Sequence, residues 1–351
     1  MISPFIRCLL CITLITAFSA TGLAQNLIPV SDRHDIIFDG SRNHLLITTD
    51  SGTVERFDLG SQTLLSGFNV GVDLSGGDIT PDGNFLYVGE EQAGATQSII
   101  RKVDLNDGSR TNLTYTQVSL EAGAWDVVIT DNGRAFTTGR FAGSGGVPLR
   151  EIDLSNDTFT IRDTVRQRTH LHRSSDRSSF LGLESNSSAG PIFTYDAATD
   201  SFPEQQNTGT SLSNDIGAAS RNGDFYLVQD SILNSSLGVF DILPYSVGGA
   251  AFDPFRDIVY VADFQADELI GYDFVGLEEL FRVGIGENIS SSGAFPPTEL
   301  AISDDSNFIA LTTPDGVRIF ENPIAVPEPS AFALLLAGLL VTGARRKKQQ
   351  F

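Results

Sequence analysis

The 351-residue chain contains very little cysteine, tryptophan or methionine, with two, one and one residue of these types. Both cysteines, Cys8 and Cys11, lie near the N-terminus, in a segment that we expect to be removed. The mature chain then has no disulfide, so burial of apolar surface must stabilise it. Because 41% of the residues are hydrophobic and 24 are phenylalanine, the chain is also too apolar to be disordered.

Basic residues are scarce as well. Lys102 is the only lysine between the two ends of the chain, which hold five of the 23 basic and one of the 44 acidic residues. The part between the ends therefore carries a net charge of about −25. We expect no nucleic-acid partner, since phosphate binding needs clustered lysine and arginine. Divalent cations, basic polymers and simple solubility in salty water remain open as explanations of the negative charge.

The N-terminus has the layout of a secretory signal peptide. Arg7 precedes an apolar run over residues 8–18, and the small residues Gly22 and Ala24 follow it. We expect signal peptidase to cut between Ala24 and Gln25. A retained membrane anchor is the alternative, but the apolar run is shorter than the roughly 20 residues that cross a bilayer.

The C-terminus combines three elements in a fixed order. These are Val326-Pro327-Glu328-Pro329, an apolar run over residues 331–344, and four basic residues at 345–348. The prolines keep the motif extended, and the basic residues favour the cytoplasmic side of the membrane. The arrangement resembles the PEP-CTERM sorting signal of Gram-negative bacteria. The resemblance implies a transient membrane segment and cleavage near the motif by an exosortase. A plain C-terminal membrane tail is the alternative.

Between these ends the chain repeats itself, which is typical of propeller blades. One recurring element is an apolar residue followed by an acid at the end of a strand: Phe57-Asp58, Val103-Asp104, Ile152-Asp153, Tyr195-Asp196, Phe240-Asp241, Tyr272-Asp273 and Phe320-Glu321. A second element, an apolar strand with a polar turn before it, also occurs seven times: residues 45–49, 86–88, 136–138, 180–183, 225–228, 259–261 and 309–312. No amphipathic helix of useful length interrupts the repeats, whereas alternation at period two is frequent.

These repeats predict an all-β, seven-bladed β-propeller of four-stranded blades over residues 25–322, between a signal peptide (1–24) and a sorting signal (323–351). The pattern resembles the YVTN-type, lactonase-like propeller repeat. The last repeat has only three strands of its own, so we expect residues 26–30 to supply the fourth and close the ring. Pro29 cannot donate a ladder hydrogen bond, so this strand must be an outer edge. A two-sheet sandwich is the structural alternative.

A candidate site follows from aligning the repeats. The positions ten residues before the second strands should open the innermost strands and meet at one mouth of the channel. They are Asp35, Gly76, Asp126, His170, Asp215, Gly249 and Glu299, with Trp125 and His172 beside them. Carboxylate oxygens suit Ca²⁺ or Mg²⁺, so Asp35, Asp126, His170, Asp215 and Glu299 form a hypothetical cation site. Alternatively, each acid accepts hydrogen bonds from nearby backbone N–H groups.

Two classes of function fit this sequence. The preferred one is a non-enzymatic, monomeric binding module, exported and processed at both ends, that ends at the outer surface or in the extracellular exopolysaccharide matrix. Its ligand, whether polysaccharide, protein or small molecule, is left open. The second is a metal-dependent, lactonase-like hydrolase at the channel mouth, with His170, Asp126 and Glu299 as candidate residues. No catalytic motif carries over residue by residue.

Overall fold

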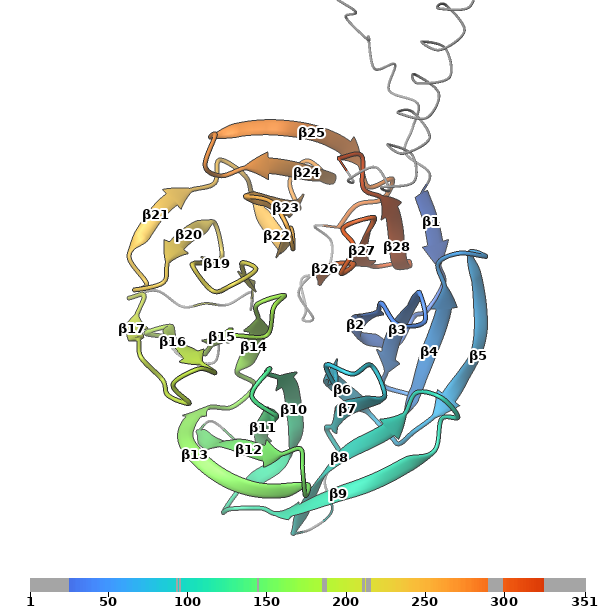
Figure 1. The fold of residues 1–351 in the computed structure, drawn as a ribbon, viewed down its shortest axis with the longest axis vertical. Helices are drawn as coiled ribbons and strands as arrows, with labels where there is room; N and C mark the ends of the chain where they lie inside the picture. Colours follow the sequence, from blue (N-terminus) through green and yellow to red (C-terminus); the bar gives the residue numbers. More distant parts are fainter. Residues whose placement is uncertain are drawn as a thin grey trace, which may run out of the picture.

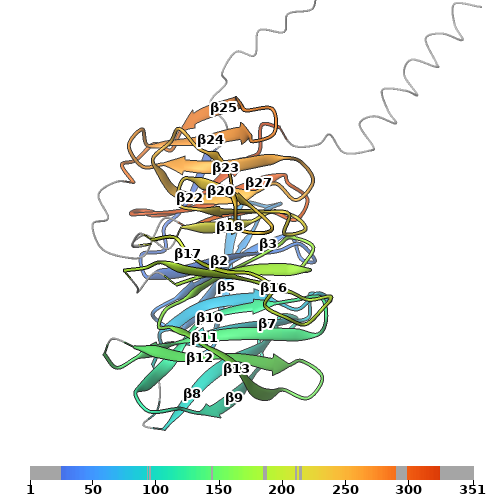
Figure 2. The ribbon, with the colours of Figure 1, turned by 90° about the vertical axis from the view of Figure 1, so that its left-hand side faces the viewer.

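The computed structural model describes residues 25–324 apart from 93, 95, 144, 185–187, 210–211, 213–215 and 290–298. The regular elements within this part of the chain are strands, which pair into seven antiparallel four-stranded sheets. The sheets stand as blades around one axis (Figure 1). From the edge they form a disc, and the strands run across its thickness (Figure 2). The predicted seven-bladed β-propeller is confirmed.

Blades 1 to 4 each run from an innermost to an outermost strand in chain order. Blade 1 contains β2 (Arg33–Asp39), β3 (His44–Thr49), β4 (Thr53–Asp58) and β5 (Thr63–Asn69). Blade 2 contains β6 (Leu74–Ile79), β7 (Phe85–Glu90), β8 (Gln97–Asp104) and β9 (Arg110–Thr116). Blade 3 contains β10 (Glu121–Ile129), β11 (Arg134–Phe141), β12 (Gly146–Asp153) and β13 (Thr158–Arg166). Blade 4 contains β14 (His170–Arg173), β15 (Ser179–Leu183), β16 (Pro191–Asp196) and β17 (Gln205–Asn207).

Blades 5 and 6 follow the same order, and blade 7 is completed from the other end of the chain. Blade 5 contains β18 (Gly217–Ala219), β19 (Phe225–Val228), β20 (Ser231–Asn234) and β21 (Val239–Ile242). Blade 6 contains β22 (Val247–Phe252), β23 (Ile258–Asp263), β24 (Glu268–Asp273) and β25 (Glu278–Gly284). Blade 7 contains β26 (Leu300–Ile302), β27 (Phe308–Thr313), β28 (Gly316–Glu321) and β1 (Gln25–Ile28).

The N-terminal strand closes the ring as predicted. β1 pairs antiparallel with β28, with Gln25 opposite Phe320 and Ile28 opposite Val317. It is the outermost strand of blade 7, and Pro29 comes directly after its last residue, where no ladder hydrogen bond is needed. Hydrogen bonds between the first and the last strand of the propeller therefore close the disc (Figure 1).

The polar turn of each repeat is a hydrogen-bonded unit. In blade 2, Thr80 Oγ1 donates to Asp82 Oδ1 at 2.6 Å and accepts the N–H of Phe85 at 3.1 Å. In blade 7, Ser303 has the same role: it donates to Asp305 at 2.6 Å and accepts the N–H of Phe308. A hydroxyl can donate and accept at once, which is why Ser or Thr suits the end of an innermost strand.

In blades 1 to 4 and 6, the recurring acid ends the third strand and accepts backbone N–H groups of the next turn. Asp153 Oδ1, for example, accepts the N–H of Ser155 at 2.9 Å. Blade 5 differs from the other blades, because its Phe240-Asp241 pair lies near the end of the outermost strand β21. The third strand, β20, ends instead at Asn234, whose Oδ1 accepts the N–H of Ser236 at 3.1 Å. An asparagine side chain offers the same acceptor, so the motif is present there without its acid.

The hydrophobic core is divided into seven clusters, one between each pair of neighbouring blades. Between blades 3 and 4, for example, Phe136, Phe180 and Tyr195 are buried with ring centroids 4.5–5.1 Å apart. Apolar side chains fill the spaces between the sheets, and only the innermost strands border the axis of the disc. Their side chains therefore decide what the channel contains.

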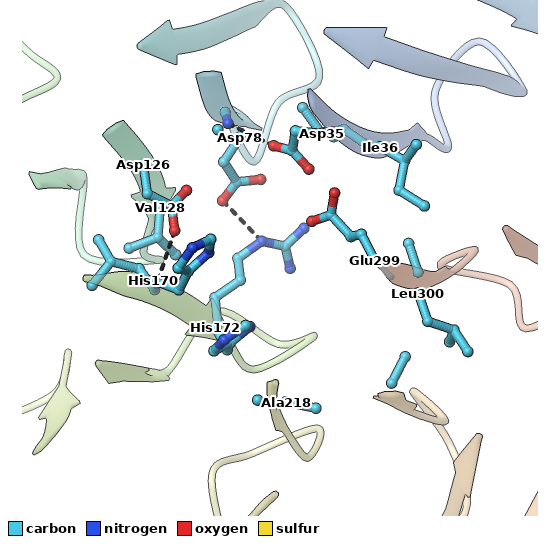
Figure 3. A pocket seen from close by; sticks show the side chains of 18 of the residues that line it. Asp35, Ile36, Asp78, Asp126, Val128, His170, His172, Ala218, Glu299 and Leu300 are labelled. Carbon is cyan, nitrogen blue, oxygen red and sulfur yellow. Dashed lines mark hydrogen bonds and ion pairs between the residues drawn. The ribbon is translucent and has the colours of Figure 1, made fainter. Parts of the chain in front are cut away.

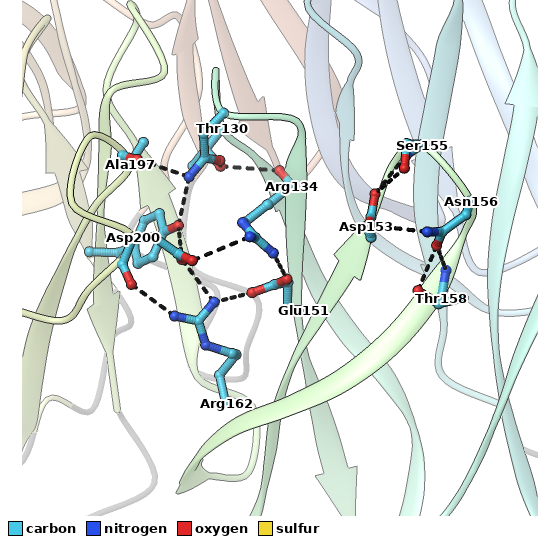
Figure 4. Close-up of polar contacts among 12 residues, drawn as sticks. Thr130, Arg134, Glu151, Asp153, Ser155, Asn156, Thr158, Arg162, Ala197 and Asp200 are labelled. Atoms are coloured by element: carbon cyan, nitrogen blue, oxygen red, sulfur yellow. Dashed lines mark hydrogen bonds and ion pairs between the residues drawn. The ribbon is translucent and has the colours of Figure 1, made fainter.

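An ion-pair network also joins blades 3 and 4 (Figure 4). Buried Glu151 contacts both Arg134 and Arg162, and the two arginines contact Asp200 of blade 4 at 3.3 and 2.8 Å. Tyr195 completes the network by donating its hydroxyl to Asp200 at 2.8 Å. This network lies away from the channel and holds the two blades together.

Candidate functional site

The innermost strands enclose a cavity of about 600 Å³ in the central channel. All seven blades contribute to its lining through their first strands, which are β2, β6, β10, β14, β18, β22 and β26. Figure 3 shows Asp35 and Glu299 with their carboxyl groups toward each other, and Asp126 and His170 across the cavity from Leu300. The cavity is the candidate site because its size is typical of pockets for small ligands.

The structure places the aligned positions together. Asp35, Gly76, Asp126, His170, Gly249 and Glu299 all line this cavity. Asp215 lies outside the described residues. Side chains in a strand alternate, and equivalent positions of a propeller face the same way, so one position per blade faces the axis at the same depth.

The acids of this ring connect neighbouring blades. Asp35 Oδ2 accepts the backbone N–H of Gly77 in blade 2 at 2.7 Å. Asp126 Oδ2 accepts the N–H of Leu171 in blade 4, also at 2.7 Å. The Glu299 carboxyl accepts the N–H of Ile36 in blade 1. Each acid therefore bonds the innermost strand of the blade that follows its own, which gives the ring a structural role.

Burial changes the charge of these three acids. Burial raises the pKa of Asp35 and of Glu299, which hydrogen-bond each other across the seam between blades 1 and 7. Two carboxylates in contact cannot both ionise easily, so the pair shares a proton. Burial, with the nearby charge of Asp35, also raises the pKa of Asp126 to about 8. The ring is therefore less negative at neutral pH than its composition indicates.

The alignment of repeats missed a fourth acid, Asp78 in β6. Its Oδ2 accepts the N–H of Ile129 at 2.8 Å and contacts Arg173 Nε at 2.8 Å and Arg177 at 3.0 Å. Both arginines come from blade 4, so this bridge passes blade 3 and ties blade 2 to blade 4. Burial would raise the pKa of Asp78, but the two guanidinium groups hold it below its ordinary value. The signal was available in the sequence, because Asp78 is two residues after Gly76 and faces the same side of the strand.

The indole of Trp125 contacts two imidazoles of the cavity lining. Its Nε1–H donates to His170 Nε2 at 3.1 Å, and its ring centroid is 5.1 Å from that of His34. Arg168 lies over the indole, with its guanidinium carbon 5.0 Å from the ring centroid. Burial lowers the pKa of both His34 and His170 to about 4. His170 is therefore neutral at pH 7 and accepts the indole proton at Nε2.

The lining is unequal around the ring. Of the described residues that line the cavity, the charged and imidazole side chains belong to blades 1 to 4, except Glu299 and Asp304 of blade 7. Blades 5 to 7 instead contribute seven glycines and alanines: Gly217, Ala218, Ala219, Gly249, Ala250, Ala251 and Ala301. A Cβ at Gly217 would lie 2.5 Å from His172 Cδ2, so this glycine makes room for an imidazole of the neighbouring blade.

The cation hypothesis finds no support in this geometry. Within the part of the chain that the structure describes, no group of three or more His, Cys, Asp or Glu side chains could hold a metal ion. Asp35, Asp126 and Glu299 are turned onto backbone N–H groups of the next blade instead. The described acids therefore do not fit Ca²⁺ or Mg²⁺ as a set, and a site that includes Asp215 stays a prediction.

Comparison with solved structures shows the same fold at low identity. A chain of Kuenenia stuttgartiensis hydrazine synthase has a TM-score of 0.64 and 14% identity, over 85% of this chain and 98% of that one. The structure of U3-55K has a TM-score of 0.62 and 10% identity, over 85% and 98%. The WD40 repeats of RRP9 have a TM-score of 0.62 and 11% identity, over 85% and 97%. No curated protein matches the chain. At these identities the likeness shows the fold alone.

The PEP-CTERM protein-sorting motif matches residues 325–348. The match includes Val326, Pro327, Glu328 and Pro329, so the predicted sorting signal is confirmed. It implies an exported protein that an exosortase processes. Among the described residues, no helix is long and apolar enough to span a membrane. The predicted signal peptide and the apolar run 331–344 lie outside these residues.

Proposed function

We propose that this protein is an exported binding module that holds its ligand in the propeller channel. After cleavage near Pro327-Glu328-Pro329, the domain stays at the outer surface or in the extracellular matrix as a monomer. The observation that carries the proposal is the cavity of about 600 Å³, with imidazole, indole and carboxyl groups on one side and small residues on the other. If the channel served only to pack the blades together, apolar side chains could fill it and no polar cavity would be needed.

The first experiment tests the channel as the binding site. Melting of the purified protein is measured with a library of small molecules, since a ligand at 100 times its Kd stabilises the folded state by about 2.7 kcal/mol. Ala301→Leu adds three carbon atoms to the cavity and should abolish the shift. The matched control is Ala198→Leu, the same change at an exposed turn residue, which should leave the shift unchanged. A ligand that stabilises Ala301→Leu as well as the wild type would rule out the channel.

The second experiment tests the processing. Replacing Pro327, Glu328 and Pro329 together by alanine should leave the apolar run attached, because the recognised motif is gone. The mass of the exported protein is measured in the membrane and medium fractions, with Ser330→Ala as control. Release of the triple variant at the mass of the mature wild-type protein would contradict exosortase processing at this motif.

A further inference from the structure

Three of the carboxyl groups that line the cavity differ from most other buried acids of this protein. Asp35, Asp126 and Glu299 contact no arginine or lysine among the described residues. Other buried carboxyls do contact an arginine, namely those of Asp78, Glu90, Glu121, Glu151 and Asp253. A buried carboxyl without a cation is held in its neutral form or shares a proton. The cavity therefore presents these three carboxyls as neutral donors and acceptors, while the charge of Asp78, which also lines it, is balanced by Arg173 and Arg177.

The imidazoles add two further uncharged polar groups to this wall, which also contains the side chains of Arg33, Arg168, Asp50, Asp73 and Glu91. His170 is neutral, with Nε2 accepting the Trp125 N–H, and His34 is neutral because burial lowers its pKa to about 4. A neutral imidazole has one donor and one acceptor, and a protonated carboxyl also has both. A ligand hydroxyl group can also donate one hydrogen bond and accept two. It can therefore pair with any of these neutral imidazole and carboxyl groups.

The opposite wall, from blades 5 to 7, is mostly apolar, with Glu299, Ser303 and Asp304 as its polar residues. Ala251 and Ala301 are partly exposed there, two residues after the ring positions Gly249 and Glu299 on their strands. With Gly217 they provide positions with no long side chain, beside Ile216, Phe252, Leu300 and Ile302, and such positions suit close approach of C–H groups. The volume of about 600 Å³ lies within the 300–1,000 Å³ of small-ligand pockets.

From this cavity geometry we infer that the channel binds a short neutral saccharide, its hydroxyls on Glu299 and the polar wall of blades 1 to 4 and its C–H faces on the small residues of blades 5 to 7. The inference rests on the proposed function and names its ligand class. An acidic saccharide would be repelled by the strongly negative net charge of the chain. A cation would have to displace the proton that Asp35 and Glu299 share.

The single tryptophan of the chain, Trp125, makes the test site-specific. Its fluorescence is followed while the purified protein is titrated with neutral di- and trisaccharides, with a galacturonic acid trimer, with a glucosamine trimer and with CaCl₂. We expect a saturable change with at least one neutral saccharide, and at least tenfold weaker binding of the charged probes. The inference is overturned if a charged probe binds more tightly than every neutral saccharide, or if no saccharide binds.

Two cavity-filling variants from different blades place the signal in the channel. Ala301→Leu and Ala251→Leu should each weaken neutral saccharide binding at least tenfold, while Ala198→Leu binds as the wild type does. Melting curves identify a variant that fails to fold, and the wild-type titration stands without either variant. If the library in the previous section yields a channel ligand and no saccharide binds, the proposed function survives and this inference falls. If nothing binds in the channel, both fall.

Discussion

The channel has two unlike halves, although both are lined by the equivalent innermost strands of their blades. Among the described residues, blades 1 to 4 line the channel with most of its charged and aromatic side chains, whereas blades 5 to 7 contribute seven glycines and alanines and only two charged residues. The backbone is repeated seven times, so the fold itself does not require the difference. The two halves therefore show that, in this propeller, the chemistry of the channel is set by which side chains depart from the repeat.

Ion pairs and hydrogen bonds also connect the blades of the polar half to one another. Asp78 of blade 2 reaches Arg173 and Arg177 of blade 4, and Asp126 of blade 3 bonds Leu171 of blade 4. In the other half, Gly217 is small because His172 of the polar half occupies the adjacent space. Three changes, from the largest expected effect to the smallest, test how far the halves depend on each other.

Removing the bridge inside the polar half should have the largest effect. Asp78→Ala leaves two largely buried guanidinium groups without their carboxylate, which typically costs about 3–5 kcal/mol of unfolding free energy. Urea or guanidinium unfolding measures the loss. Asp131→Ala, at an exposed acid of a nearby turn, is the control and should change stability by less than about 0.5 kcal/mol. Equal stability of the two variants would mean that the bridge contributes nothing.

A methyl group placed between the halves should have a medium effect. Gly217→Ala brings a Cβ to 2.5 Å from His172 Cδ2, so the imidazole has to shift, at a cost of about 1–3 kcal/mol. Gly284→Ala is the control, because its added Cβ meets no atom within 4 Å. Thermal melting of both variants compares them. If Gly217→Ala and Gly284→Ala had the same Tm, the contact with His172 would not be the reason for a glycine at position 217.

The pH dependence of stability should show the smallest effect. The folded-state pKa of Asp126 is raised to about 8, so its contribution to stability is complete at low pH and is lost as the pH rises toward 8. The pKa values of His34 and His170 are lowered to about 4, so their contribution is lost as the pH falls from 6.5 to 4. Below pH 6.5 the two trends oppose each other, and above it only the carboxyls act.

We therefore expect Tm to fall between pH 6.5 and 8, and Asp126→Asn to flatten this fall. The control is Asp163→Asn, at an exposed acid of β13, which should keep the wild-type slope. A Tm that rises over this range in the wild type would show that Asp126 is ionised in the folded protein.

Much of the architecture could be predicted from local patterns. The second strands at 86–88 and 225–228 follow from alternation between turns, and β1 closes blade 7 because the last repeat lacks a strand. Blade 5 is the exception, because its apolar-acid pair Phe240-Asp241 lies in β21, while Asn234 takes the acid's place at the end of β20. A motif this short cannot distinguish one strand of a blade from the next.

The candidate site was predictable only in part. Alignment found Asp35, Asp126, His170 and Glu299, because equivalent positions of the repeats share a depth in the channel. It did not find the bridge from Asp78 to Arg173, which joins residues 95 positions apart on blades that are not neighbours. Nor could the alignment show that Trp125 donates to His170, since aligned repeats do not determine the rotamer of a side chain.

The sequence by itself determined the seven blades, their closure and the sorting signal, because strand alternation, turn residues and a linear motif are local properties of the chain. Only the tertiary structure decided what the channel is. Ring closure brings strands from all seven blades around one axis, and burial there turns acids that the sequence shows as charges into proton-sharing groups bonded to the next blade.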